Sequence, residues 1–158
     1  MAEKIVINTS PIIAFEKMQA LDIVSQLPLT FVCPIEVKNE ILAGTAKGLT
    51  VAFPSWIQIL RLSKPLSPLI LASLDAGEAA AIELALEQKI LTVCLDETKG
   101  RRAALASGLQ IVGSLGLIGK AKTLRLISSV RPFIEKAQSG GIFYDAKLVE
   151  NFIKSLGE

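Results

Sequence analysis

The chain has 158 residues, of which 51% are hydrophobic and 20% are charged, so it can build a folded core and is excluded from the disordered class. Its length suits one domain, which we expect to span residues 1–158. The net charge of +2 leaves nucleic-acid binding open, because a local basic patch can be hidden in a near-neutral total.

The sequence contains no histidine, which removes Ser–His–Asp and Cys–His triads, histidine zinc sites and histidine general bases. Cys33 and Cys94 lie in apolar strand-like segments, where we expect buried, reduced core residues rather than a disulfide or a metal pair. Any chemistry must therefore rest on carboxylates, lysine, arginine, hydroxyls or a metal bound by oxygen.

The sequence also indicates where the protein works. No apolar segment approaches the roughly 18 residues of a membrane span. The first ten residues show no signal-peptide pattern and lead into a strand-like segment. We therefore expect a cytoplasmic protein that has no contact with a membrane.

In chain order, the first predicted element is a short β-branched strand over residues 4–7. Ser10 as N-cap and Pro11 at the first helical position then predict a helix that runs to Met18. A second short helix is expected over residues 21–27.

The next predicted strand covers residues 29–33, and a helix follows over 34–43 with Gly44 as its C-terminal stop. Glu36 and Glu40 are four residues apart and hence share one face of this helix. Either both carboxylates face water, or one of them turns inward to a cation. Both alternatives are compatible with the pattern.

The middle of the chain begins with a loop over residues 45–55 and a strand over 56–62. Ser67 and Pro68 then predict a helical segment that leads to Leu74.

The most informative segment comes next. Asp75 followed three residues later by Glu78 is a capping-box pattern, which predicts a helix over 76–88. Residues 90–95 form a short apolar run that predicts a buried strand ending at Asp96. Ligands collect beyond the carboxyl ends of such strands. The alternative is structural, since Glu78 can simply complete the capping box and Asp96 can simply cap the next helix.

The remaining elements repeat the alternation of strands and helices. We expect a helix over 98–107, a strand over 109–112, a helix over 115–126, and tail helices beginning at Pro132 and spanning 146–156. The order predicts an α/β fold, a three-layer α/β/α sandwich with a mostly parallel central sheet.

The glycine-rich segment after the last strand only partly resembles a nucleotide-binding loop. A Walker A loop places glycine five residues before its Gly-Lys pair, but here that position is Ser114. Ala121 also replaces the hydroxyl residue that follows the lysine, so we exclude a phosphate loop of this type.

The carboxyl ends of parallel strands share one edge of the sheet, so Glu40, Asp96 and Asn8 are expected to converge there. Glu78 joins them if its helix starts at or near that edge. An oxygen-only site of this kind suits magnesium or manganese rather than zinc.

At this point the sequence resembles the PIN-domain ribonucleases, in particular a PIN-like branch related to the toxins of toxin–antitoxin systems. The resemblance runs from IVINTSPII through LDAGEAAAIELA and LDETKGRRAA to GSLGLIGKAK. In that family, a small acidic cluster holds Mg or Mn and directs water onto an RNA phosphodiester.

The resemblance assigns a place to each candidate. Asn8 matches the first metal ligand of the family, Glu40 the second, Glu78 the third and Asp96 the fourth. Ser114 matches the polar residue near the end of the last strand, where it would meet the substrate. Many family members act with an antitoxin protein and are dimeric, so RNA, an antitoxin and a second copy of the chain are the implied partners.

The chain departs from the family at its first site residue, where the usual aspartate is Asn8. Asparagine can still ligate a metal through its carbonyl oxygen, but one negative charge is lost, so we expect weaker metal binding. Glu40, Glu78 and Asp96 would remain, with Glu97 beside Asp96.

Two hypotheses follow from this departure. In the first, the protein is an active metal-dependent endoribonuclease, and Arg101 and Arg102 contact the RNA backbone. Lys99 on the same segment fits a solvated helix face. In the second, the protein is a PIN-like module that has lost catalysis and binds RNA or a partner protein. An ion pair between Arg101 and Glu78 that filled the site would favour the second hypothesis.

Overall fold

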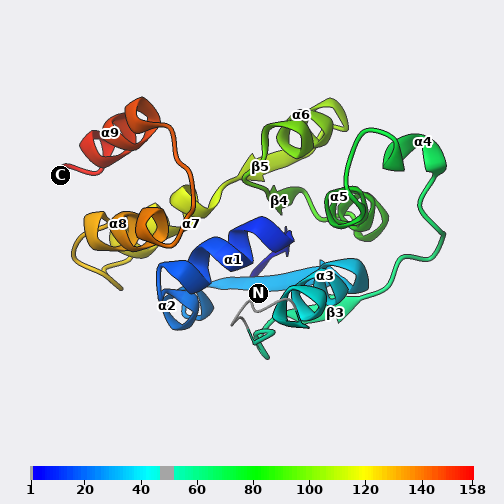
Figure 1. Cartoon of the computed structure of the whole chain (residues 1–158), viewed down its shortest axis with the longest axis horizontal. Coiled ribbons are helices and arrows are strands. Elements are labelled where there is room, and N and C mark those ends of the chain that lie inside the picture. Colours follow the sequence, from blue (N-terminus) through cyan, green and yellow to red (C-terminus); the bar gives the residue numbers. More distant parts are fainter. Residues whose placement is uncertain (1, 47–51) are drawn as a thin grey trace. The chain divides into compact units, whose positions relative to one another are not determined.

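The computed structural model describes residues 2–46 and 52–158 of the chain. In chain order these residues form β1 (Glu3–Ile7), α1 (Thr9–Lys17), α2 (Leu21–Ser25), β2 (Leu29–Pro34), α3 (Ile35–Ala46), β3 (Gln58–Leu60), α4 (Pro68–Leu71), α5 (Ala76–Gln88), β4 (Thr92–Cys94), α6 (Thr98–Ala106), β5 (Gln110–Val112), α7 (Ser114–Thr123), α8 (Arg131–Ser139) and α9 (Ala146–Ser155) (Figure 1).

The five strands form one sheet in the order β3-β2-β1-β4-β5, and every neighbouring pair is parallel. β1 lies at the centre, where Val6 pairs in register with Val32 of β2 and with Val93 of β4. The predicted α/β sandwich with a mostly parallel sheet is confirmed. Because all strands run the same way, their carboxyl ends lie along one edge, and the central strand delivers Asn8 to that edge.

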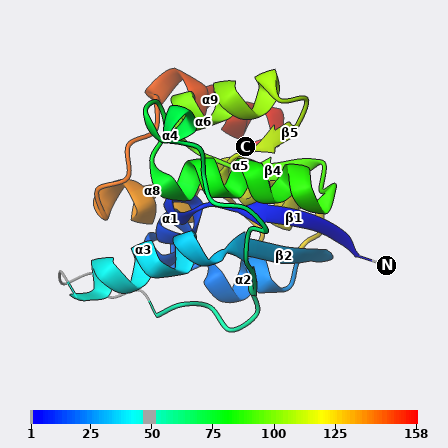
Figure 2. The same ribbon diagram turned by 90° about the vertical axis from the view of Figure 1, so that its right-hand side faces the viewer.

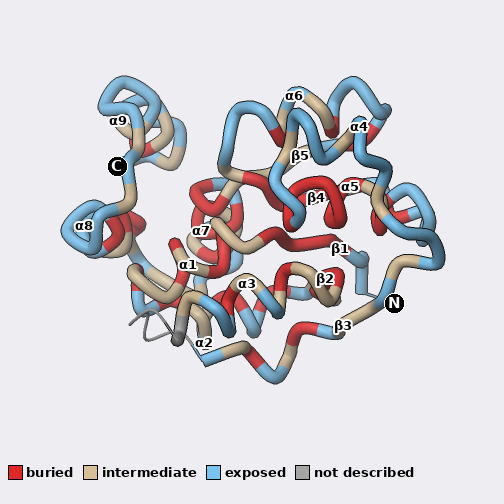
Figure 3. Tube along the Cα trace, turned by 45° about the vertical axis from the view of Figure 1, so that its right-hand side comes forward, coloured by how far each residue is buried: buried red, intermediate tan, exposed pale blue. Residues whose placement is uncertain are grey.

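The core on one face of the sheet forms between the strands and helices α5 and α6. Val6, Val32 and Val93 contribute the strand side, and Leu84 and Ala104 belong to the same buried cluster. Figure 2 shows α5 running along the sheet, and its contacts include β1, β2 and β4. The burial pattern follows this packing, with the central strands and most of α5 buried (Figure 3). Burying apolar side chains on both faces explains why these strands read as continuous apolar runs.

The chain divides into two compact units. One unit comprises residues 1–12 and 28–113 and contains the whole sheet together with α3, α4, α5 and α6. The other comprises residues 13–27 and 114–158 and contains α2, α7, α8 and α9. The predicted acidic residues all belong to the first unit, whereas Ser114 belongs to the second.

Local cap chemistry predicted some helix ends correctly and others wrongly. α5 has the predicted bounds, and Ser67 caps α4 by accepting a hydrogen bond from the backbone N–H of Leu69. The predicted N-cap role of Ser10 is wrong, because α1 already begins at Thr9. The predicted stop at Gly44 is also wrong, since α3 continues to Ala46. Glycine ends a helix by adopting the left-handed backbone, which Gly108 does after α6 (φ 83°).

The strand predictions found the right segments, but β1 and β2 each extend one residue beyond the predicted bounds, and the other three strands were predicted too long. β3, β4 and β5 each contain three paired residues, because the apolar runs extend beyond the hydrogen-bonded ladder. Ile90, for example, is buried just before β4 without belonging to it, and its backbone N–H donates to the carbonyl of Ala85 in α5. The predicted loop over 45–55 begins inside α3, and residues 47–51 of it lie outside the described residues.

Two further predictions concern the cysteines and the membrane. Cys33 and Cys94 are buried and free, as expected. In the described part of the chain, no helix combines the length and the apolar character that a membrane span requires.

Candidate functional site

The first turn of α5 carries the capping box that the sequence predicts. The side chain of Asp75 accepts a hydrogen bond from the backbone N–H of Glu78 at 2.8 Å, and Glu78 Oε1 accepts one from the backbone N–H of Asp75 at 3.4 Å. The capping box uses only one carboxylate oxygen of Glu78, however. Its side chain is buried, with 4% exposure, and Oε2 has no hydrogen-bond partner among the described residues. The structural role of Glu78 therefore leaves one buried carboxylate oxygen unpaired.

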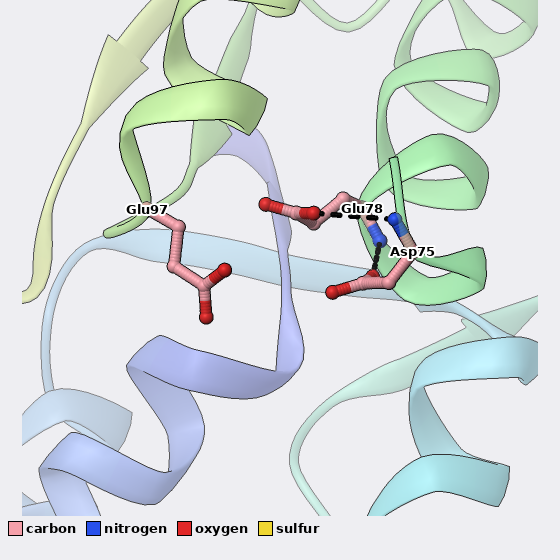
Figure 4. A group of neighbouring side chains, drawn as sticks. All are labelled: Asp75, Glu78 and Glu97. Carbon is pink, nitrogen blue, oxygen red and sulfur yellow. Dashed lines mark hydrogen bonds between the residues drawn. The ribbon is translucent and has the colours of Figure 1, made fainter. Parts of the chain in front are cut away.

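Three carboxylates meet at this point. Asp75, Glu78 and Glu97 each offer an oxygen within 4.8 Å of the other two. Figure 4 shows the side chains of Asp75 and Glu78 leaving the start of α5 on the side where Glu97 lies. Glu97 precedes α6 without capping it, and its carboxylate instead accepts a hydrogen bond from the Ser10 hydroxyl at 2.9 Å. Residues distant in sequence therefore hold this acidic group together.

Glu40 approaches the same place from α3. Its Oε1 accepts a hydrogen bond from the Thr9 hydroxyl at 2.6 Å, and it also accepts one from the backbone N–H of Gly77. Burial raises the pKa of Glu40, repulsion by Asp75 and Glu97 adds to the rise, and the two hydrogen bonds oppose it. Glu40 thus turns inward to the Thr9 hydroxyl and the Gly77 backbone, and the cation of the sequence alternative stays a prediction.

Within the described part of the chain, the negative charge of Glu78 is not balanced by a positively charged ion-pair partner. Burial raises its pKa to about 7, and repulsion by Asp75 and Glu97 contributes in the same direction. In the described residues, no lysine or arginine forms an ion pair with any of these carboxylates. A bound cation would lower the pKa of Glu78, because it stabilises the ionised carboxylate.

Asn8 ends the central strand with a second unpaired oxygen. Its backbone N–H donates to the carbonyl of Cys94 at 3.2 Å, which extends the β1–β4 pairing by one residue. The side chain is buried, and its Oδ1 lacks a hydrogen-bond donor among the residues described, as does Oε1 of Glu36. Leaving a buried acceptor unpaired costs about 1–3 kcal/mol. Such an atom at the end of a parallel strand indicates a place for a ligand.

Asp96 and the basic residues after it are arranged differently from the acidic group. Asp96 follows β4 and is half-buried, and it does not belong to the group of three close carboxylates. Arg101 donates from Nη1 to the carbonyl of Leu95 at 3.0 Å. The ion pair between Arg101 and Glu78 that would have filled the site is not among the ion pairs of the described residues. Lys99 is exposed, as expected for a solvated face.

Ser114, predicted to meet the substrate, is the first residue of α7 in the second unit. It is fully buried, and its hydroxyl forms a hydrogen bond of 2.7 Å with the hydroxyl of Tyr144. Its role towards a substrate stays a prediction.

Sequence reasoning gave too small a role to two residues of the acidic group. Asp75 was interpreted only as a cap, because the capping-box pattern fully accounts for an aspartate at that position. Glu97 was included only as a neighbour of Asp96. Asp75 lies next to Glu78 through the capping box, whereas Glu97 is brought there by the juxtaposition of the starts of α5 and α6, which no local pattern encodes.

The donor set fits a hard divalent cation. All candidate ligand atoms are carboxylate or amide oxygens, which magnesium, manganese and calcium prefer. Glu78 and Asn8 each present a buried oxygen that has no partner in the described structure. The raised pKa of Glu78 marks a place where positive charge would be stabilising. The residues therefore fit a divalent metal, although they do not select one ion.

Comparison with known families identifies the family of the chain. A family model described as a PIN domain matches residues 4–158. The match covers nearly the whole chain, including both compact units, and the chain therefore belongs to the PIN-domain family. Neither the curated proteins nor the solved structures gave a significant match.

Proposed function

We propose that this protein is a divalent-metal-dependent nuclease that hydrolyses RNA phosphodiesters. The observation that carries the proposal is the group formed by Asp75, Glu78 and Glu97, with the buried Glu78 lacking both a cationic partner and a donor to Oε2. Membership of the PIN-domain family supports the same conclusion.

Glu78, Asp75 and Glu97 would hold the cation, with Glu40 alongside and Asn8 as a neutral oxygen donor. The resemblance adds Asp96 to this set. A bound magnesium or manganese ion supplies a more acidic water and stabilises negative charge on the phosphate.

The chain's own residues position these oxygens before any ligand arrives. The Thr9 hydroxyl fixes Glu40, the Ser10 hydroxyl fixes Glu97, and the backbone N–H of Asp75 fixes Glu78. Thr9 and Ser10 lie in the first turn of α1, directly after Asn8. One short segment therefore orients carboxylates from two other helices, which is the preorganisation that a catalytic site requires.

The substrate and partners follow from the resemblance. We propose RNA as the substrate, with Arg102, Arg101 and Ser114 as the residues that contact it. A role as the toxin of a toxin–antitoxin pair, an antitoxin protein as partner, and a homodimer belong to the same proposal.

A second candidate function is a PIN-like module without catalysis, and one observation favours it. Asn8 replaces the usual aspartate and removes one negative charge from the site. Such a module would bind RNA or a protein and would be indifferent to the loss of the other carboxylates.

Cleavage of a labelled single-stranded RNA separates the two candidates. The wild-type protein is expected to cleave in manganese or magnesium and to stop in excess chelator, and Glu78→Gln should lower the rate at least about 100-fold. Glu135→Gln, which alters an exposed carboxylate on α8, serves as the matched control and should retain the wild-type rate. Equal rates in wild type, Glu78→Gln and chelator would contradict the nuclease.

A further inference from the structure

Three glycines in the first unit have no conformational reason to be glycine. Gly77 is the second residue of α5, Gly100 is the third residue of α6, and Gly113 follows β5. None of them has the positive φ that favours glycine. A glycine within a helix is less stable than alanine by about 1 kcal/mol. Their presence therefore needs a reason in the surrounding structure.

The space around each glycine supplies that reason. A Cβ at Gly77 would collide with Oε1 of Glu40 and would lie 2.8 Å from its Cδ. A Cβ at Gly100 would lie 2.7 Å from Oε2 of Glu78, which is the unpaired oxygen of the site.

The third glycine shows the same relation to a third carboxylate. A Cβ at Gly113 would lie 3.0 Å from Oδ1 of Asp96 and 2.9 Å from Nη1 of Arg101. The carboxylates that the sequence predicts as catalytic, Glu40, Glu78 and Asp96, thus each lie directly against a different glycine.

We propose that Gly77, Gly100 and Gly113 are positioning residues of the acidic site. Gly77 and Gly100 leave the space in which Glu40 and Glu78 approach the acidic group, and Gly113 leaves the space for Asp96, which the resemblance adds to the site. The inference rests on the proposed function in one respect, namely that the converging oxygens bind a divalent cation.

The atoms that a new Cβ would meet at Gly77 and Gly100 are the ends of flexible glutamate side chains. Alanine at either position should therefore displace the carboxylate and leave the helix intact. The expected consequence is a protein that folds normally and binds the cation poorly. A purely structural role for the glycines would give the opposite result, with lost stability and unchanged affinity.

Manganese titration by calorimetry tests the consequence for the site. Gly77→Ala and Gly100→Ala are each expected to weaken manganese binding about 10-fold or more, the usual range for residues that orient metal ligands. Gly116→Ala is the matched control, because Gly116 is the exposed third residue of α7. Its affinity should stay within about 2-fold of the wild-type value, which is far smaller than the loss expected at an orienting residue.

Shortening the displaced side chain tests whether the loss arises from the proposed collision. Glu78→Asp withdraws the carboxylate by one methylene and makes room for a Cβ at position 100. The double variant Gly100→Ala, Glu78→Asp should therefore bind manganese more tightly than the product of the two separate losses predicts. Losses that simply multiply would overturn the proposal for Gly100.

A melting experiment without metal separates this inference from the proposed function. In a Glu78→Ala background, Gly100→Ala should raise Tm by about 2–4 °C, the ordinary gain of alanine over glycine in a helix. With Glu78 present, the same substitution should give a clearly smaller gain or a loss. If this difference appears while no variant binds manganese, the positioning role stands and the metal-dependent function fails. Equal shifts in the two backgrounds would overturn the positioning role.

Discussion

Two buried or nearly buried glutamates, one in each compact unit, meet opposite electrostatic environments. Glu158 in the second unit is surrounded by donors from α7 and the start of α8. Its carboxylate accepts hydrogen bonds from Lys122 Nζ at 2.7 Å, from the Ser129 hydroxyl at 2.6 Å and from the Val130 backbone N–H at 2.9 Å. Burial opposes ionisation of Glu158, but these donors outweigh it and lower its pKa to about 2.

Glu78 in the first unit has the reverse surroundings. Its pKa rises to about 7 because it is buried and lies beside Asp75 and Glu97. One of its oxygens has a backbone donor, and the other has no donor within the described structure.

The difference shows what distinguishes a structural carboxylate from one kept for a ligand. A protein that buries a charge for stability normally supplies its partners, as it does for Glu158. At Glu78 the chain supplies further negative charge, which opposes ionisation of the buried carboxylate in the absence of a cation. The comparison therefore distinguishes the carboxylates around Glu78 as the candidate functional site without reference to any motif.

The largest expected effect on stability belongs to Glu158. Glu158→Gln should lower the free energy of unfolding at pH 7 by about 2 kcal/mol, because it leaves Lys122 without its charged partner. Because the folded-state pKa is below the ordinary value of about 4.5, the wild-type advantage should be complete above that pH and disappear as pH falls towards 2. Chemical denaturation of both proteins from pH 7 to pH 2 measures this difference in the free energy of unfolding. Manganese affinity should not change.

Placing a negative charge at residue 8 tests the opposite change, in which the acidic group around Glu78 gains a carboxylate. Asn8→Asp is expected to tighten manganese binding about 10-fold, because a carboxylate replaces a neutral amide among the ligands. It should also lower the Tm of the metal-free protein, since another negative charge joins the group. Calorimetry with and without manganese would record both effects. Unchanged manganese binding would indicate that residue 8 lies outside the ligand set.

Asp75 allows its capping role to be separated from its charge. Asp75→Asn keeps a good N-cap but removes the charge, so we expect several-fold weaker manganese binding with nearly unchanged Tm. Asp75→Ala removes both and should in addition lower the free energy of unfolding by about 1 kcal/mol. If the two variants bind manganese as well as the wild type, Asp75 is only a cap.

A further expected effect is the pH dependence that Glu78 gives to the stability of the metal-free protein. Because its folded-state pKa lies above its ordinary value of about 4.5, its contribution to stability is complete below that pH and is lost as pH rises towards 7. We expect a loss of about 1–2 kcal/mol, measured as the difference between wild type and Glu78→Gln. Manganese should therefore raise Tm more at pH 8 than at pH 5.5. A stability difference that does not vary with pH would show that Glu78 is not perturbed.

The fold was largely predictable because its signals are local. The capping box at Asp75 and Glu78 fixed the bounds of α5, and the apolar runs located every strand of the sheet. The lengths of the short strands could not be predicted in the same way, because a buried apolar residue such as Ile90 has the same sequence character whether it lies inside or outside a hydrogen-bonded ladder.

The candidate site was predictable only in part. The inward turn of Glu40 depends on Thr9, which is 31 positions away in the sequence, and the place of Glu97 depends on Ser10. The glycines that leave room for the carboxylates could not be identified either, because their reason lies in a neighbouring element. Local sequence patterns identify the acidic residues, but tertiary packing determines which of them lie close together.

Manganese titration of the wild-type protein against Glu78→Gln, by calorimetry at pH 7.5, tests the central claim most directly. The account predicts saturable binding to the wild type and to the control Glu135→Gln, and a loss of at least about 100-fold in affinity for Glu78→Gln. The same titration of Asp96→Ala would show whether Asp96 belongs to the ligand set. An absence of saturable binding to the wild type at millimolar manganese would contradict the claim that these carboxylates are kept for a cation.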